Sequence, residues 1–222
     1  MSVGAGSPSA FSGPAPEPKV EVRDLFPTPV VVSLLPEAAE INSRIKPVII
    51  ERARATTSIQ HSNLGGWQSS WDFTEWGGPA LDRILETARG LADRLTVDRQ
   101  GRAVEVDWKI NCWANINGRG HGNEFHTHPG AFWSGCYYVD DGGAADGKHG
   151  GEFELQDPRG VAPAMYAPSL TFAGRGYTAA GAAEMLVPRA GMMVLFPSWL
   201  QHAVRPYYGP AERISIAFNL SV

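Results

Sequence analysis

The sequence predicts a mainly β fold of the α+β class, in which N-terminal helices support a β-rich core. Two observations lead to this prediction. Apolar side chains recur at helical spacing over about residues 36–98, whereas about residues 102–222 form short strand-like runs separated by Gly, Pro and Asp turns. We expect one domain over residues 21–222, because a chain of 222 residues would be cramped as two.

The composition argues against several classes of protein. The net charge is -4 and the basic residues are scattered, so we expect no nucleic-acid partner. The two cysteines, Cys112 and Cys136, form no CxxC pair, which argues against a disulfide framework and fits a reducing, cytoplasmic location. We expect no signal peptide, and no apolar run approaches the ~20 residues of a membrane span.

The N-terminal half combines a tail, a strand and two helical patterns. Residues 1–20 are rich in Gly, Ser, Ala and Pro, which predicts a disordered tail. A β-branched run at Val30–Val32, bounded by prolines, predicts a strand. Residues 37–54 predict a helix that Pro47 kinks or restarts, and 61–78 predict an irregular segment or a short strand. The clearest helix is predicted over 78–98, with Gly-Pro at its start.

The C-terminal half predicts a β-sandwich or barrel. Strand-like runs occupy residues 103–118, 132–141, 150–158, 183–200, 202–209 and 213–222. Between two of them, residues 157–184 form a longer connection than a compact domain usually contains. We interpret it as a lid or a substrate-recognition insert, because structureless loops beyond ~15 residues are usually functional or disordered.

A pair of histidines, His126 and His128, lies two residues apart in a segment that reads as extended. Alternate side chains of a strand share a face, so both imidazoles would point the same way, with Glu124 beside them. Imidazole is a common ligand of iron, zinc, copper and nickel. The alternative is a solvated or hydrogen-bonded pair in a polar turn.

Two later features strengthen the metal hypothesis. His202 follows a strongly apolar strand and a Pro-Ser turn, and eleven residues later comes Arg213, with Ser215 on the same strand face. An Arg beside a hydroxyl can hold a carboxylate through charge-assisted hydrogen bonds. The alternatives are a partly buried strand histidine and a surface arginine on an edge strand.

With these residues in view, the chain resembles the Fe(II)/2-oxoglutarate-dependent oxygenases, and within them a largely uncharacterised bacterial and phage group. The matching segments are His126–Pro129, Ser134–Val139, Gly151–Phe153 with Asp157–Arg159, Pro188 with Gly191, Leu195–His202 and Arg213–Asn219. They cover most of residues 105–222. The resemblance implies a double-stranded β-helix, or jelly-roll, core with a metal site near its open end.

The resemblance also implies residue roles. His126 and His202 match the two histidine ligands of the family, and Arg213 with Ser215 matches the grip on the far carboxylate of 2-oxoglutarate. The usual acidic ligand is replaced by His128. Either His126, His128 and His202 form a three-histidine site, or Glu124 or Asp157 completes the two-histidine-one-carboxylate set. The first hypothesis is favoured because His-x-His keeps the spacing of the motif that it replaces.

We therefore expect a non-haem Fe(II) dioxygenase with 2-oxoglutarate as co-substrate, hydroxylating an unknown small-molecule or side-chain substrate and releasing succinate and CO2. Two alternatives stay open: a cupin-like three-histidine dioxygenase that does not use 2-oxoglutarate, and a non-catalytic jelly-roll binding module. No membrane association is expected, and by resemblance the protein would form a homodimer. Candidate pocket residues, each with core packing as its alternative role, are Asn111, Trp113, Asn115, Tyr138 and Trp199.

Overall fold

The computed structural model describes residues 17, 19–21, 23, 25–160, 165, 167–170 and 183–222. Most of the predicted tail, and most of the predicted insert at 157–184, lie outside the described residues.

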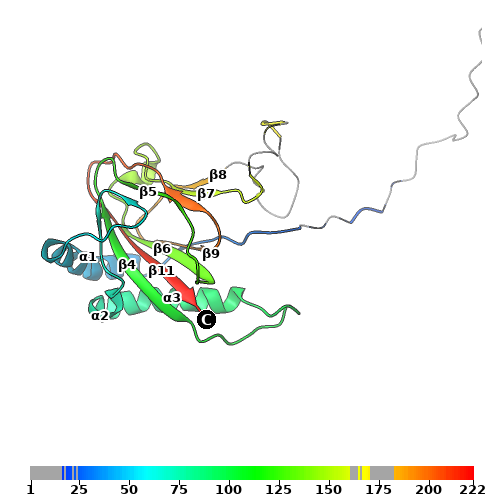
Figure 1. Cartoon of the computed structure of the whole chain (residues 1–222), viewed down its shortest axis with the longest axis horizontal. Coiled ribbons are helices and arrows are strands. Elements are labelled where there is room, and N and C mark those ends of the chain that lie inside the picture. The colour runs from blue at the N-terminus through cyan, green and yellow to red at the C-terminus, as the bar shows by residue number, and fades with distance from the viewer. Residues whose placement is uncertain are drawn as a thin grey trace, which may run out of the picture.

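Two antiparallel sheets face each other and form the β-rich core (Figure 1). The six-stranded sheet contains, in spatial order, β1 (Val31–Leu34), β9 (Met192–Pro197), β6 (Trp133–Asp140), β11 (Arg213–Ser221), β4 (Lys109–Asn117) and β3 (Trp67–Gln68). The five-stranded sheet contains β2 (Asn63–Leu64), β5 (Gly122–His126), β10 (His202–Val204), β7 (Phe153–Gln156) and β8 (Ala183–Leu186).

The order in which the chain visits the two sheets makes this core a double-stranded β-helix. From β4 onward, β4, β6, β9 and β11 lie in one sheet, and β5, β7, β8 and β10 in the other. The chain thus crosses repeatedly between the sheets and pairs segments that are far apart in the sequence. The predicted mainly β fold with a jelly-roll core is confirmed.

Helices cover the outer face of the six-stranded sheet, as predicted (Figure 1). They are α1 (Ala38–Ala55), the short α2 (Phe73–Trp76) and α3 (Gly78–Leu95), and a 3-10 turn, η1 (Ala144–Asp146), follows β6. The buried faces of α1 and α3 share one apolar core with the outward side chains of β11, such as Ile214, Ile216 and Phe218. α1 continues through Pro47, where a kink or a new turn was expected.

A second apolar cluster fills the space between the two sheets. It contains Tyr138, Phe153, Leu155, Val194 and Phe196, with Met192 and Leu200. The alternation of β6 explains the separation of the two cores: Tyr137 packs toward the helices, whereas Tyr138 packs into the interior of the jelly roll. The candidate site therefore lies in the inner layer and the helices stabilise the outer one.

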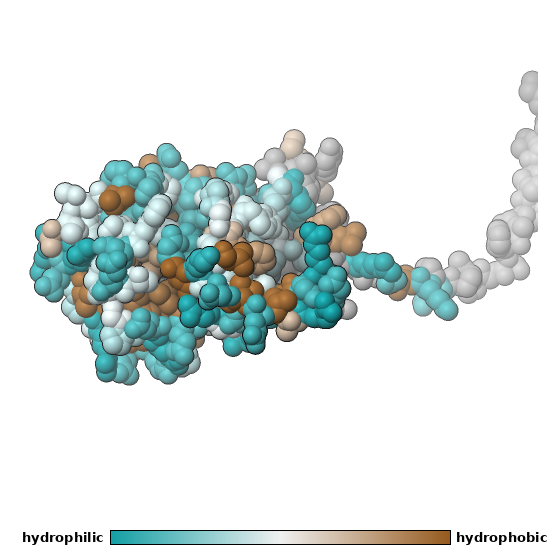
Figure 2. All heavy atoms as spheres, turned by 60° about the horizontal axis from the view of Figure 1, so that its bottom comes forward, coloured by the Kyte–Doolittle hydropathy of each residue, from teal (hydrophilic) through white to brown (hydrophobic). Residues whose placement is uncertain are grey.

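The helical side is turned forward in Figure 2, where hydrophilic side chains cover most of the surface and hydrophobic atoms show between them. None of the helices in the described part of the chain has the length and apolar character that crossing a bilayer requires.

Candidate metal centre

The five-stranded sheet brings two distant histidines face to face. β5 and β10 are antiparallel neighbours, and His126 at the end of β5 is the direct cross-strand partner of His202 at the start of β10. His128 lies two residues beyond β5, where its backbone N–H donates to the carbonyl of Ser198 at 3.0 Å. The rings of His126 and His128 therefore point to the same side of the chain, as the sequence predicted, and β10 supplies the third ring.

The three imidazoles form one compact cluster. The ring centroids of His126 and His202 are 4.3 Å apart, and the Nε2 atoms of His128 and His202 are 3.2 Å apart. One ligand nitrogen from each of the three rings lies within 4.8 Å of the other two. Such a group of nitrogens is small enough to surround a single metal ion.

Backbone carbonyls fix which nitrogen of two rings faces the cluster. Nδ1 of His126 donates to the carbonyl of Glu124 at 2.7 Å, and Nδ1 of His202 donates to the carbonyl of Leu200 at 2.8 Å. A carbonyl can only accept, so Nδ1 carries the proton and Nε2 presents a lone pair. This arrangement orients metal-binding histidines in proteins generally.

Burial keeps the cluster uncharged at neutral pH. Desolvation lowers the pKa of His128 to about 4 and that of His202 to about 3, with a smaller lowering from the neighbouring His126. The pKa of His126 is also lowered, again mainly by desolvation. Three neutral nitrogen donors that converge on one point suit a divalent cation, which would offset the mutual repulsion of their lone pairs.

The two carboxylates named as alternative ligands lie outside this cluster. Glu124 is exposed and contributes its backbone carbonyl, which accepts from His126. Asp157 is buried and accepts hydrogen bonds from the backbone N–H and the guanidinium of Arg159. The three-histidine hypothesis is thus the one that matches the side chains brought together, and the choice between the two stays a hypothesis.

A buried guanidinium lies on the opposite sheet. Arg213 is 1% exposed; its Nη1 donates to the carbonyl of Gly151 at 2.7 Å and its Nη2 donates to Oδ1 of Asn117 at 3.1 Å. Both acceptors are neutral, so they do not balance the charge. Within the described residues, the Nε of Arg213 and the hydroxyl of Tyr138 are buried without a hydrogen-bond partner.

These two unsatisfied donors fit a bound carboxylate. The guanidinium carbon of Arg213 lies 5.8 Å from the ring centroid of Tyr138, and Ser215 is the cross-strand partner of Tyr138. Leaving a buried donor unpaired costs about 1–3 kcal/mol, more for a charged group, so an anion bound here would recover that energy. Tyr138 also packs in the cluster that includes Phe153 and Phe196, whose rings contact His202.

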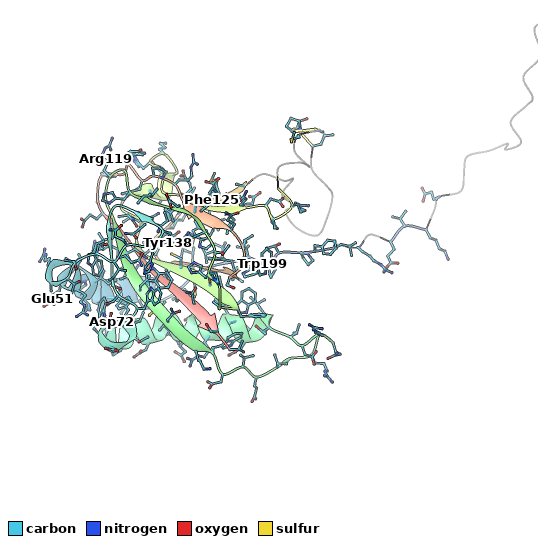
Figure 3. All side chains as sticks on the ribbon, viewed as in Figure 1. Glu51, Asp72, Arg119, Phe125, Tyr138 and Trp199 are labelled. Atoms are coloured by element: carbon cyan, nitrogen blue, oxygen red, sulfur yellow. The ribbon has the colours of Figure 1, made fainter. Side chains whose placement is uncertain are left out.

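Four of the five predicted pocket residues lie along the inner face of the six-stranded sheet. Asn111, Trp113 and Asn115 pair with Asn219, Ala217 and Ser215 of β11, and the Trp113 ring centroid lies 5.8 Å from that of His128. Tyr138 is interior, whereas Trp199, which is 54% exposed, lies in the turn before β10 (Figure 3).

Sequence reasoning missed two partners of Arg213. Asn117 continues the same alternation by one more step, near the end of the run 103–118 that the sequence predicts as a strand. Gly151 adopts a left-handed φ of +77°, and a Cβ at this position would lie 3.3 Å from Nη1 of Arg213. The glycine thus lets the backbone approach the guanidinium closely.

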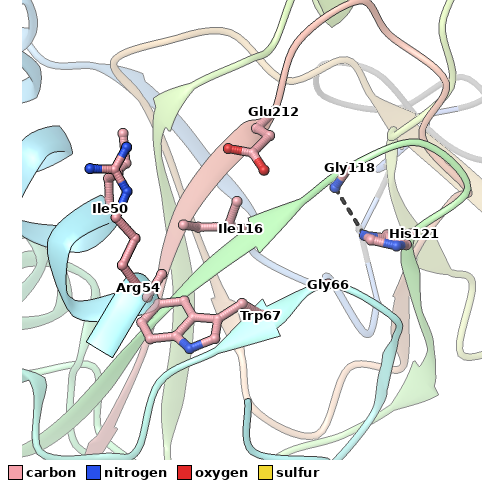
Figure 4. A pocket seen from close by; sticks show the side chains of 9 residues that line it. Ile50, Arg54, Gly66, Trp67, Ile116, Gly118, His121 and Glu212 are labelled. Atoms are coloured by element: carbon pink, nitrogen blue, oxygen red, sulfur yellow. Dashed lines mark hydrogen bonds between the residues drawn. The ribbon is translucent and has the colours of Figure 1, made fainter. Parts of the chain in front are cut away.

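A separate hollow of about 540 Å³ lies away from the histidine cluster. Arg54 of α1 and Glu212, just before β11, line it together with Trp67 and His121 (Figure 4). His121 accepts from the backbone N–H of Gly118 at 2.9 Å and takes no part in the cluster.

Comparisons with known proteins give one family and a common fold. Residues 111–219 match the family model described as "Putative 2OG-Fe(II) oxygenase". A search of curated proteins finds no match. Among solved structures, a prolyl-4-hydroxylase of Pseudomonas putida matches with 16% identity and a TM-score of 0.58, over 86% of this chain and 91% of that chain.

Two further structures share the fold. A prolyl hydroxylase of Trichoplax adhaerens, in complex with a hypoxia inducible factor peptide fragment, matches with 15% identity and a TM-score of 0.60, covering 86% of this chain and 83% of that one. HygX of Streptomyces hygroscopicus, with nickel and 2-oxoglutarate bound, matches with 11% identity and a TM-score of 0.52, covering 87% and 83%.

Proposed function

We propose that this chain, which the match over residues 111–219 identifies as a 2OG-Fe(II) oxygenase, holds Fe(II) on His126, His128 and His202. It would hold 2-oxoglutarate on Arg213 and hydroxylate a substrate, with release of succinate and CO2. The observation that carries the residue assignment is the convergence of three imidazole nitrogens within 4.8 Å of one another, beside a jelly-roll interior that contains a buried arginine.

The three histidines would occupy one face of the metal and leave the remaining positions to co-substrate and dioxygen. When bound, Fe(II) together with 2-oxoglutarate and O2 supplies the oxidant that inserts oxygen into a C–H bond. The hydrogen bonds from His126 and His202 to backbone carbonyls hold the rings in place before the metal arrives. Little reorganisation is then needed on binding.

Arg213 would anchor the far carboxylate of 2-oxoglutarate. Its unpaired Nε and the hydroxyl of Tyr138 are the available buried donors, and Ser215 adds a hydroxyl on the same strand face. Because the metal ligands would all be neutral, the two negative charges of the co-substrate would be divided between the ion and Arg213. Arg213 would then pair with one carboxylate through its free Nε, in addition to its two neutral acceptors.

The apolar side chains around the cluster would keep water away. Phe153 and Phe196 pack against the ring of His202, which is 3% exposed, and Trp113 packs against His128. The ring of His128 is more open to solvent than that of His202, so substrate would approach from the side of His128 and His126. Asn111, Asn115 and Trp199 are the proposed contacts beyond the metal centre.

The test is an anaerobic titration of the apo protein with Fe(II) and then 2-oxoglutarate, followed by visible spectroscopy. We expect a metal-to-ligand charge-transfer band that requires both additions. His128→Ala should lose at least tenfold in Fe(II) affinity, whereas the matched control His149→Ala, outside the cluster, should keep it. Full iron retention by His128→Ala would transfer the third-ligand role to Glu124 or Asp157.

The buried donors of Arg213 and Tyr138 support 2-oxoglutarate over the cupin-like alternative, which has no use for a second anion site. Succinate formation from 2-oxoglutarate separates the two. The substrate class, the homodimer, the cytoplasmic location and the lack of a nucleic-acid partner stay predictions.

A further inference from the structure

A chain of aromatic rings leads from the histidine cluster to the protein surface. The ring centroid of His128 is 5.8 Å from Trp113, Trp113 is 6.4 Å from Trp71, and Trp71 stacks on His61 at 5.2 Å and 14°. All three separations are within the contact range of aromatic pairs. Trp113 is 9% exposed and Trp71 is 55% exposed, so the chain runs from the interior to solvent.

The backbone fixes this contact. Residues 69–72 lie alongside β4, because Ser69 exchanges two hydrogen bonds with the backbone of Ala114 and Asp72 forms a parallel bridge with Cys112. Asp72 is held in turn by an ion pair of 2.9 Å with Arg52 of α1. Trp71 is therefore placed beside Trp113 by a segment that lies before the region matched by the family model.

Among the aromatic rings that contact the histidine cluster, Trp113 differs in how easily it is oxidised. In the described part of the chain, the other aromatic rings that contact the three histidines are those of Phe153 and Phe196, both against His202. An indole gives up an electron far more readily than a phenyl ring. Trp113 is thus the readily oxidised ring in contact with the cluster, and its aromatic neighbour on the other side is Trp71.

We propose that Trp113 and Trp71 form an electron relay that restores the ferrous centre when 2-oxoglutarate and O2 react without a substrate. This inference rests on the proposed function. Such a cycle converts 2-oxoglutarate and O2 to succinate and CO2, and leaves one oxygen atom and two oxidising equivalents unused.

The relay accounts for both equivalents. Trp113 passes one electron toward the metal centre, Trp71 refills Trp113, and an enediol reductant such as ascorbate refills Trp71 at the surface. After two such transfers the oxygen atom, with two protons from solvent, leaves as water. Each succinate formed then corresponds to one ascorbate oxidised to dehydroascorbate. Without reductant, both electrons come from Trp71 itself, which takes up a hydroxyl group from water and releases two protons, so that Trp71 is hydroxylated.

The experiment maps oxidation by peptide mass spectrometry after substrate-free turnover with Fe(II), 2-oxoglutarate and O2, without ascorbate. In the wild type, oxygen addition is expected at Trp71, and ascorbate should suppress it. In Trp113→Phe, oxidation of Trp71 per succinate should fall at least tenfold. The matched control is Trp67→Phe, a change of the same kind in a neighbouring strand but outside the ring chain, because the Trp67 indole donates to the carbonyl of Thr56; it should leave the value unchanged.

A second variant keeps the inference testable if Trp113→Phe does not fold. In Trp71→Phe the relay lacks its outer member, so Trp113 no longer receives an electron from its neighbour. Oxidation should then accumulate at Trp113, which is buried and should stay unmodified in the wild type. Oxidation of Trp71 within twofold of wild type in Trp113→Phe overturns the relay, as does an unmodified Trp113 in Trp71→Phe. Succinate formation without these shifts leaves the proposed function intact, whereas a wild type that forms no succinate removes both.

Discussion

Binding of Fe(II) to this protein at pH 6 should release almost no protons. A metal ion displaces any proton carried by a ligand nitrogen, so proton release reports how far the histidines are protonated beforehand. An ordinary imidazole has a pKa near 6.5. Here burial lowers the pKa of His128 to about 4 and that of His202 to about 3, so both rings are already neutral.

The size of the effect follows from these values. At pH 6, an imidazole of pKa 6.5 carries about 0.76 proton, so two ordinary ligands would release about 1.5 protons. With the lowered pKa values, His128 and His202 together release about 0.01 proton. The lowered pKa of His126 acts in the same direction. Between pH 6 and pH 5, ordinary ligands would each lose about 8-fold in Fe(II) affinity, and these two almost nothing.

The assay is anaerobic calorimetric titration with Fe(II) at pH 6 in two buffers of different ionisation enthalpy, since the difference in apparent enthalpy gives the number of protons released. Free imidazole titrated in the same buffers is the control, and it should release the number of protons that its ordinary pKa predicts at pH 6. A release of 1.5 protons or more by the protein would refute the claim that burial keeps the cluster neutral.

Four further outcomes are expected. Arg213→Gln should retain Fe(II) but weaken 2-oxoglutarate binding by roughly 30-fold or more, measured by titration of the charge-transfer band, because a charged anchor of a carboxylate is lost. Tyr138→Phe should weaken the same binding by about tenfold while leaving the urea midpoint unchanged or raised, since its buried hydroxyl has no partner in the described structure. Ile45→Ala, a change in the fully buried face of α1, should lower the free energy of unfolding by about 2–5 kcal/mol in urea denaturation without altering the metal-to-protein ratio at saturation. Acidification of the apo protein from pH 8 to pH 5 should lower its free energy of unfolding by about 4 kcal/mol through His128 and His202. The unfolded chain binds protons on these two histidines below about pH 6.5, whereas the folded rings, with pKa values of about 4 and about 3, do not accept them. An equal acid sensitivity in a His128→Asn/His202→Asn double variant would contradict this.

Local patterns were enough to predict much of the fold. The helix predicted over 78–98 is α3, Gly78–Leu95, because its apolar spacing and its Gly-Pro start are both local signals. The run 183–200 is divided into β8 and β9 by the turn before Gly191, and the run 202–209 is a strand only to Val204. Pro206 shortens that strand, since it has no N–H to donate to a neighbour.

The site was predictable where it depends on strand alternation. The spacing of His126 and His128, and that of Asn111, Trp113 and Asn115, placed each set on one face. Joining His202 to the first pair required the resemblance to a family, because no local signal states which strands become neighbours. For the same reason the roles of Asn117 and Gly151 beside Arg213 were missed.

The aromatic chain was beyond reach of the sequence for a further reason. The position of Trp71 depends on hydrogen bonds between residues 69 and 114, which are 45 residues apart, and on an ion pair between Asp72 and Arg52 of α1, which are 20 residues apart. His61 belongs to the segment 61–78 that the sequence does not place in a helix, and it is exposed, yet its ring lies flat on Trp71.

The direct cross-strand pairing of His126 with His202 has a consequence for biogenesis. Because side chains alternate along a strand, a slip of one residue between β5 and β10 would turn one imidazole away from the other. The convergence of the histidine rings thus exists in a single alignment, and it cannot appear during synthesis until the segment that carries His202 has left the ribosome and docked. Iron added during refolding should accordingly favour the correctly aligned pair of strands over shifted ones, so that the cofactor would act as a template for its own binding site.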